Sequence, residues 1–302
     1  MTSASTVPVS RVPARLARFV LRMFRPHVYV TYGLLWTLSL ESSAVSLTGT
    51  PWRPSGATWA RVTSVVLALL FLRMLDEQKD LEYDRVHHPD RPLVTGAITA
   101  GELRAGMAVS TAVVICLNAA LSPAAVLLVL AALGYGLLLA AVERLSAPVR
   151  DRQLLGLAAA CPVQVLLGCY VYGSLAAAGT VTADWRGAVL LALSACVFLH
   201  FEFARKTAWQ APPGECLYSV VLGPRRSAAV TAAFAAGAVV CQIVLFLPYG
   251  PAGLLPCLIA ALPAWGLRRF SAARRGCWPM PAAAGFVAGT HLALTVRAAV
   301  LP

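Results

Sequence analysis

Nearly half of the acidic side chains in this chain lie in one short stretch. Six of the 13 occur between positions 76 and 90, namely Asp76, Glu77, Asp80, Glu82, Asp84 and Asp90. On a helix, the i, i+4, i+8 spacing puts Asp76, Asp80 and Asp84 on one face, with Glu77 and Arg73 close to it and Glu82 pointing away. Such a stripe repels itself unless a cation binds. The pattern therefore favours a metal site over a solvated helix end paired with Lys79 and Arg85.

The chemistry of these side chains narrows the choice of metal and ligand. Carboxylate oxygens suit hard divalent cations, and Mg²⁺ typically joins one or two carboxylates to a substrate phosphate while keeping several waters. We call residues 72–96 the acidic segment, and we expect it to form a magnesium-diphosphate platform.

A second polar segment, residues 200–223, carries Glu202, Arg205 and Lys206. The chain has only two lysines against 23 arginines, and one of them lies in each polar segment. Lysine is a compact point charge and arginine a planar fork, and both bind phosphate. We expect these residues to bind ligand rather than to form a simple surface pair.

The amino-acid composition indicates that the elements carrying these two polar segments lie in a membrane. Hydrophobic residues make up 59% of the 302 positions and charged residues 13%, with a mean hydropathy of +0.72. Soluble globular proteins carry about 25% charged residues, so an ordinary soluble enzyme, a disordered chain and a fibrous protein are excluded. The eight cysteines form no C-x-x-C pair, which argues against a disulfide framework or a zinc site.

Nine segments are long and apolar enough to cross a hydrocarbon core about 30 Å thick. They are 27–47, 58–76, 103–121, 123–142, 153–175, 186–205, 227–248, 251–267 and 281–301. Ahead of them, Arg11, Arg15, Arg18, Arg22 and Arg25 follow helical spacing, which predicts an amphipathic helix on the membrane surface. The expected organisation is an N-terminal interfacial segment, 1–26, and one all-α transmembrane domain, 27–302, with nine helices in a bundle and cytoplasmic active-site loops.

The basic residues predict the orientation of this bundle. With the N-terminus placed in the cytoplasm, 21 of the 25 lysines and arginines fall on the cytoplasmic side, as the positive-inside rule requires. The C-terminus is then outside. The net charge of +12 follows from orientation and anionic lipid, so we expect no nucleic-acid partner. The alanine- and arginine-rich composition suggests a bacterial plasma membrane.

These segments together resemble the UbiA-type intramembrane prenyltransferases over nearly the whole chain. The family's first motif, N-D-x-x-D-x-x-x-D followed by P-x-R-P, is similar to D-E-x-x-D-x-x-x-D here, at Asp76, Glu77, Asp80 and Asp84. It continues at Pro89, Arg91, Pro92 and Gly96. Asp76 replaces the usual Asn, and Glu77 replaces the usual Asp.

The second motif departs further from the family pattern. Where the family has D-x-x-x-D-x-x-x-D, this chain has Glu202, Lys206 and Gln210. One carboxylate remains, one is replaced by a cation and one by an amide. The resemblance therefore implies a divergent branch in which Arg205 and Lys206 contact the diphosphate directly.

The resemblance implies an enzyme that ionises an allylic isoprenoid diphosphate with Mg²⁺. The metal ligands carried over are Asp76, Glu77, Asp80, Asp84 and Glu202, and the diphosphate-binding residues are Arg73, Arg91, Arg205 and Lys206. The prenyl group would pass to a small, aromatic acceptor. Cyclisation of the same diphosphate by a UbiA-type terpene cyclase is the alternative, because both reactions share the ionising site. A membrane transporter is a weaker alternative, because we expect no charged pair at mid-span.

Overall fold

The computed structural model describes residues 12–210 and 217–300, with the side chains of residues 150 and 151 left aside. Part of the predicted N-terminal segment, residues 1–11, lies outside this range. Regular structure in the described residues is helical, apart from one isolated bridge between Ala208 and Cys277. The all-α fold class is thus confirmed. The longer helices are α2 (Pro26–Ser46), α3 (Gly56–Lys79), α5 (Ala100–Ala119), α6 (Pro123–Leu145), α8 (Gln153–Ala177), α9 (Trp185–Arg205), α11 (Pro224–Phe246), α13 (Ala261–Ala273) and α14 (Met280–Val300).

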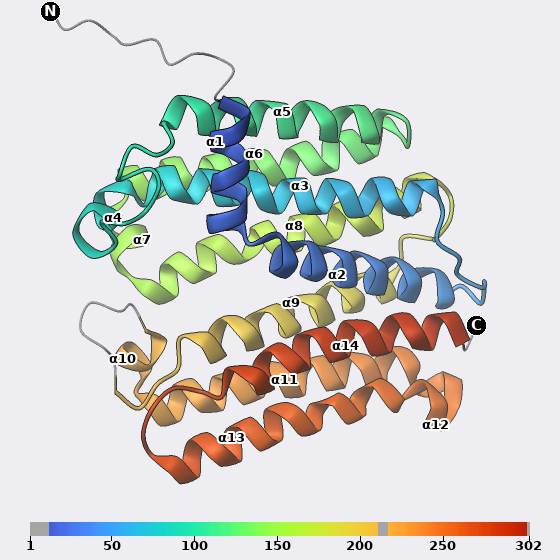
Figure 1. The fold of residues 1–302 in the computed structure, drawn as a ribbon. Coiled ribbons are helices and arrows are strands. Elements are labelled where there is room, and N and C mark those ends of the chain that lie inside the picture. The colour runs from blue at the N-terminus through green and yellow to red at the C-terminus, as the bar shows by residue number, and fades with distance from the viewer. Residues whose placement is uncertain (1–11, 211–216, 301–302) are drawn as a thin grey trace, which may run out of the picture.

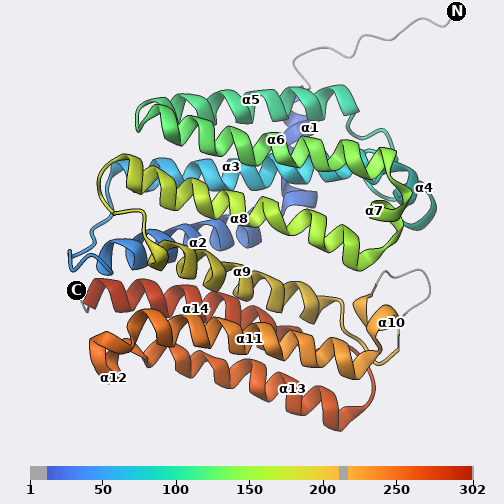
Figure 2. The ribbon, with the colours of Figure 1, turned by 180° about the vertical axis from the view of Figure 1, so that it is seen from behind.

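The long helices lie side by side along one direction, so that their connections fall at the two ends of the bundle (Figures 1 and 2). The most extensive packing joins α9 to α11, α6 to α8, α3 to α5 and α2 to α14. The short helices α4 (Leu81–His87), α7 (Ala147–Asp151) and α10 (Tyr218–Leu222) all lie at one end. Both polar segments therefore reach the same end of the bundle.

Polar caps determine where several of these helices begin. At α3, Ser55 and Thr58 form a capping box, and at α5 Thr99 and Glu102 form another. The side chain of Ser122 accepts from the backbone N–H of Ala125 at the start of α6, and Asp184 caps α9. Each of these residues supplies an acceptor for an N–H group that has no partner inside the helix.

The predicted number of nine membrane spans is not confirmed. In the described residues, seven helices are long and apolar enough to cross a bilayer: α3, α5, α6, α8, α9, residues 224–253 and α14. This is the make-up of an integral membrane protein. The first predicted span, α2, contains Glu41 and many hydroxyl side chains, which lower its hydropathy. The predicted span 251–267 is interrupted: α12 (Gly250–Gly253) and a 3₁₀ helix (Leu255–Ala260) precede α13, and prolines recur through the stretch and break backbone hydrogen bonding.

The N-terminal segment differs from the expected single amphipathic helix. An α-helix, α1 (Val12–Phe19), passes into a π-helix, η2 (Val20–Phe24), and Arg25 then takes a left-handed conformation at φ 47°. The two phenylalanines at the ends of these turns, Phe19 and Phe24, are buried. In Figure 1 this segment crosses the long helices α3 and α5 rather than continuing their direction. Because a π-helix has more residues per turn than an α-helix, residues 12–24 do not form one regular α-helix.

Candidate functional site at one end of the bundle

The acidic residues of the acidic segment do not lie on one continuous helix. Helix α3 ends at Lys79, Asp80 has non-helical dihedral angles (φ −86°, ψ 5°), and α4 starts at Leu81. Glu77 and Asp84 are buried, whereas the side chains of Asp76 and Asp80 are about half exposed. Asp76, Asp80 and Asp84 therefore do not lie on one uninterrupted helix, although the hydrogen bonds Asp80 N–Asp76 O and Asp84 N–Asp80 O, each 2.9 Å, continue past the break. At 100° per residue, Glu77 and Asp84 are the closer pair on a helix, and the break at Asp80 preserves that pairing.

Two arginines neutralise the buried pair. Arg73, one turn before Glu77 on α3, donates from Nη2 to Glu77 Oε2 at 2.8 Å. Arg91, in the loop after α4, donates from Nη1 to Asp84 Oδ2 at 2.6 Å and lies 3.7 Å from Glu77 Oε2. The carboxylates of two helices are thus joined by guanidinium groups, as the sequence-based assignment of Arg73 and Arg91 to the same site requires.

The exposed pair surrounds Lys79. Its Nζ lies 3.4 Å from Asp76 Oδ1, 3.9 Å from Asp80 Oδ1 and 2.8 Å from Glu143 Oε2. Burial raises the pKa of Asp80 to about 6, against the opposing charge of Lys79, and the nearby carboxylates Asp76, Asp84 and Glu143 add to the rise. Asp80 is therefore a weaker acid than a free aspartate, and a cation placed beside it would favour the ionised form.

The donor atoms fit Mg²⁺, although they do not form a closed cage. Glu77 Oε1 and Asp84 Oδ1 are buried and have no hydrogen-bond partner, which is costly unless a cation or water satisfies them. In residues 12–210 and 217–300, no group of three or more His, Cys, Asp or Glu side chains is arranged to hold a metal. A metal with few protein ligands that completes its shell with water and phosphate is the usual situation for Mg²⁺.

The second polar segment forms a compact network around Glu202. Arg205 binds this carboxylate through both Nε and Nη2, the latter 2.9 Å from Oε1. Lys206 Nζ lies 3.1 Å from Oε1, and the Tyr218 hydroxyl donates to the same oxygen at 2.9 Å. Burial and the adjacent Glu202 carboxylate both raise the pKa of Tyr218, so its hydroxyl stays protonated.

Lys206 keeps room for a ligand within this network. Its ammonium lies 3.3 Å from the Tyr218 hydroxyl and 4.7 Å from the centre of that ring, and 27% of its side chain is exposed. Since an ammonium has three N–H groups, its contacts among the described residues, to Glu202 and Tyr218, leave one N–H for an incoming anion. Gln210, the third position of the altered motif, is exposed.

The structure adds two residues that sequence reasoning missed. Glu143, near the end of α6, forms the shortest of the contacts to Lys79, and Tyr218, on α10, is bonded to both Glu202 and Lys206. Glu143 is one of few acidic residues at the end of an apolar span, a signal that was available in the sequence. No spacing rule indicates Tyr218, because the chain returns to Glu202 only after a loop.

A buried charged pair joins two helices of the bundle, near one end rather than at mid-span. Glu41 of α2 and Arg61 of α3 form a buried ion pair of 3.1 Å near the end opposite to the acidic segment. The side chains of Thr58 and Trp52 also donate to Glu41, and Arg61 donates to the Ser174 hydroxyl at 2.7 Å. Each charged side chain thus has hydrogen-bond partners in addition to its ion-pair partner, which indicates a structural role.

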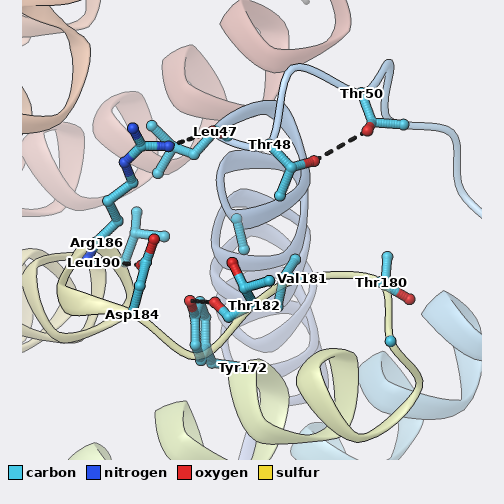
Figure 3. A pocket seen from close by; sticks show the side chains of 12 residues that line it. Leu47, Thr48, Thr50, Tyr172, Thr180, Val181, Thr182, Asp184, Arg186 and Leu190 are labelled. Atoms are coloured by element: carbon cyan, nitrogen blue, oxygen red, sulfur yellow. Dashed lines mark hydrogen bonds between the residues drawn. The ribbon is translucent and has the colours of Figure 1, made fainter.

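A cavity of about 370 Å³ opens at that opposite end (Figure 3). Several polar groups at its wall are already bound to the protein backbone: Arg186 donates to Leu47 O, Tyr172 donates to Thr182 O, and Asp184 caps α9. No residue assigned to the candidate site lines it.

Several solved structures have a similar fold over most of this chain. A UbiA homologue from Aeropyrum pernix K1 aligns with 87% of this chain and 96% of its own, at 19% identity and a TM-score of 0.61. A UbiA homologue from Archaeoglobus fulgidus bound to GPP and Mg²⁺ aligns with 93% of this chain and 99% of its own, at 17% identity and a TM-score of 0.60. A structure described for digeranylgeranylglyceryl phosphate synthase aligns with 95% and 99%, at 14% identity and a TM-score of 0.63. No family model and no curated protein matches the sequence.

Proposed function

The chain has the fold of the UbiA homologues, and we propose that it is a divergent member of that superfamily which ionises an allylic prenyl diphosphate with Mg²⁺ and transfers the prenyl group to a small acceptor. The observation that carries the proposal is the pair of unpartnered buried oxygens, Glu77 Oε1 and Asp84 Oδ1, in carboxylates that Arg73 and Arg91 contact. Support comes also from the solved homologue that holds GPP and Mg²⁺.

The proposed roles follow from the contacts of each side chain. Bound Mg²⁺ would neutralise the diphosphate and polarise its allylic C–O bond. Glu77, Asp84, Asp80 and Asp76 would supply its protein oxygens, with Glu202 from the other segment. As the C–O bond breaks, its electron pair leaves with the diphosphate and an allylic cation remains.

The cationic side chains would stabilise the charge that develops on the leaving group. Arg73 and Arg91 retain partly exposed side chains beside the carboxylates, and Arg205 and Lys206 do so beside Glu202. Fixed charges of this kind act through preorganisation, because they need no rearrangement when the bond breaks. A new bond from the acceptor to the cation, with loss of the acceptor's proton, would complete the transfer.

We also propose the arrangement in the membrane that the basic residues predict. The acidic segment and the second polar segment would lie on the cytoplasmic side, with the N-terminus, and the bundle would span the plasma membrane of a bacterium. The unit from residue 27 onward would act as one domain.

The test is incubation of purified protein in bilayers with labelled prenyl diphosphates, with and without Mg²⁺. Release of diphosphate that requires Mg²⁺ and stops with chelator supports ionisation, whereas full turnover in chelator contradicts it. Products are then identified with and without aromatic acceptors. A prenylated acceptor supports transfer, and a cyclic hydrocarbon or alcohol formed without acceptor identifies a terpene cyclase instead.

A further inference from the structure

The N-terminal segment contacts the loop that carries Arg91. Arg15 of α1 donates from Nε to Ala97 O and from Nη2 to Gly96 O, each at 2.8 Å, and its Nη1 lies 3.3 Å from Glu102. Only 13% of the Arg15 side chain is exposed. A guanidinium that uses three nitrogens at once is held in one geometry. The contact between Arg15 and the loop is therefore well defined.

Backbone hydrogen bonds within the loop connect the residues around Gly96 to Arg91 and Pro92. Gly96 has φ +72°, a conformation that side chains disfavour. The backbone N–H of Thr95 donates to Arg91 O at 2.9 Å, and that of Ile98 donates to Pro92 O at 3.2 Å. These two bonds connect the backbone on both sides of Gly96 and Ala97 to Arg91 and Pro92.

The helix that presents Arg15 is itself anchored on the bundle. Phe19 is buried, and Leu16 lies close to Gly106 of α5, where an added Cβ would come within 3.2 Å of its Cδ2 and 2.9 Å of Met74 Sδ. Arg15 is therefore tied to α3 and α5 on one side and to the loop on the other.

A second arginine of the segment contacts the same loop more weakly. Arg22 Nη2 lies 3.0 Å from both the carbonyl and Oδ2 of Asp90. Its side chain is 55% exposed and that of Asp90 76% exposed, and exposed pairs of this kind contribute little. Of these two arginines, Arg15 should therefore contribute most to holding the loop in place.

We propose that Arg15 is a positioning residue: through Gly96 and Ala97 it holds the loop of residues 88–98 where Arg91 reaches Glu77 and Asp84. The inference deepens the proposed function, because it is at this site that Arg91 would meet the diphosphate. It assigns to one arginine of the N-terminal segment a role beyond that of an interfacial or topological anchor.

The test compares Arg15→Met and Arg15→Lys with Arg18→Met, a matched loss of one arginine from the same helix. Arg18 is exposed, and it contacts Ala14 O within its own helix at 3.3 Å. Amide hydrogen exchange of the full chain in bilayer discs reports the loop directly. Because two charge-assisted hydrogen bonds are lost, Arg15→Met should accelerate exchange at Thr95 and Ile98 at least about tenfold, while α1 keeps its protection.

A second readout follows the consequence at the site. Inorganic diphosphate with Mg²⁺ should bind Arg15→Met at least about fivefold more weakly than wild type, with an intermediate value for Arg15→Lys and no change for Arg18→Met. Unchanged loop exchange in Arg15→Met overturns the proposal. Faster exchange with unaltered diphosphate binding also overturns it, because Arg15 would then hold the loop without positioning Arg91 for the ligand. If the wild type itself fails to bind magnesium diphosphate, the proposed function fails, and the exchange result alone decides whether Arg15 holds the loop.

Discussion

The buried ion pair between Glu41 and Arg61 offers a quantitative test of how the bundle is held together. The two side chains are 4% exposed and 3.1 Å apart. We consider three variants: Glu41→Met, Arg61→Met and the double variant. Methionine fills a similar volume without a polar group, so each single change leaves the other charge buried without its partner.

The expected magnitudes follow from what each variant leaves unpaired. Removing one partner of a buried pair costs about 3–5 kcal/mol, whereas replacing both with apolar residues is often near neutral. Glu41→Met should be the costlier single change, because the side chains of Thr58 and Trp52 lose their acceptor as well. Arg61→Met removes one donor from Glu41 and one contact to Ser174. The double variant should cost less than Glu41→Met alone.

The assay is equilibrium unfolding in mixed micelles by a denaturing detergent, with the free energy of unfolding measured for all four proteins. The matched control is the surface pair Glu82–Arg85, 2.7 Å apart but 82% and 56% exposed. The same cycle there should give a coupling of about 0.2–1 kcal/mol at most. Strictly additive losses at Glu41 and Arg61, equal to the sum of the two single changes, would refute the reasoning.

The remaining predictions concern the site and the packing beside it. Asp80→Ala and Asp84→Ala should each lower turnover of prenyl diphosphate at least about a hundredfold, the scale of losing one positioned electrostatic group. Glu82→Ala, which removes an exposed acid from the same segment, should stay near the wild-type rate. Equal rates in all three variants reject the assignment. At Lys206, turnover and apparent diphosphate affinity should fall in the order Lys, Arg, Ala, Asp, since the fixed cation matters and restoring an acid does not restore a metal site; a flat series, or Asp above Lys, contradicts this. Gly187→Ala should destabilise the protein by about 1–3 kcal/mol, because its Cβ would overlap the Tyr172 ring, whereas Gly134→Ala meets open space and should not destabilise it; detergent unfolding of both variants measures the difference.

Much of the molecule follows from the sequence without any structure. The apolar runs predict helices in a membrane, because no other element satisfies every backbone group within one segment in lipid. The concentration of acids at 76–90 and the basic residues near it predict a charged site at the end of a span. The i, i+4 spacing of Arg73 and Glu77 also places opposite charges on one helical face.

Other features were decided only by tertiary packing. The burial of Glu77 and Asp84 and their shared contact with Arg91 depend on where the loop after α4 places that arginine. Glu143 and Tyr218 join the site from other helices, and no local pattern reports such contacts. The same holds for Arg61, which lies in the predicted span 58–76 and whose buried partner, Glu41, lies on another helix. Local periodicity determines which face of its own helix a residue occupies. The partner across an interface depends on how helices distant in sequence pack together, and this packing determines which residues these charges contact.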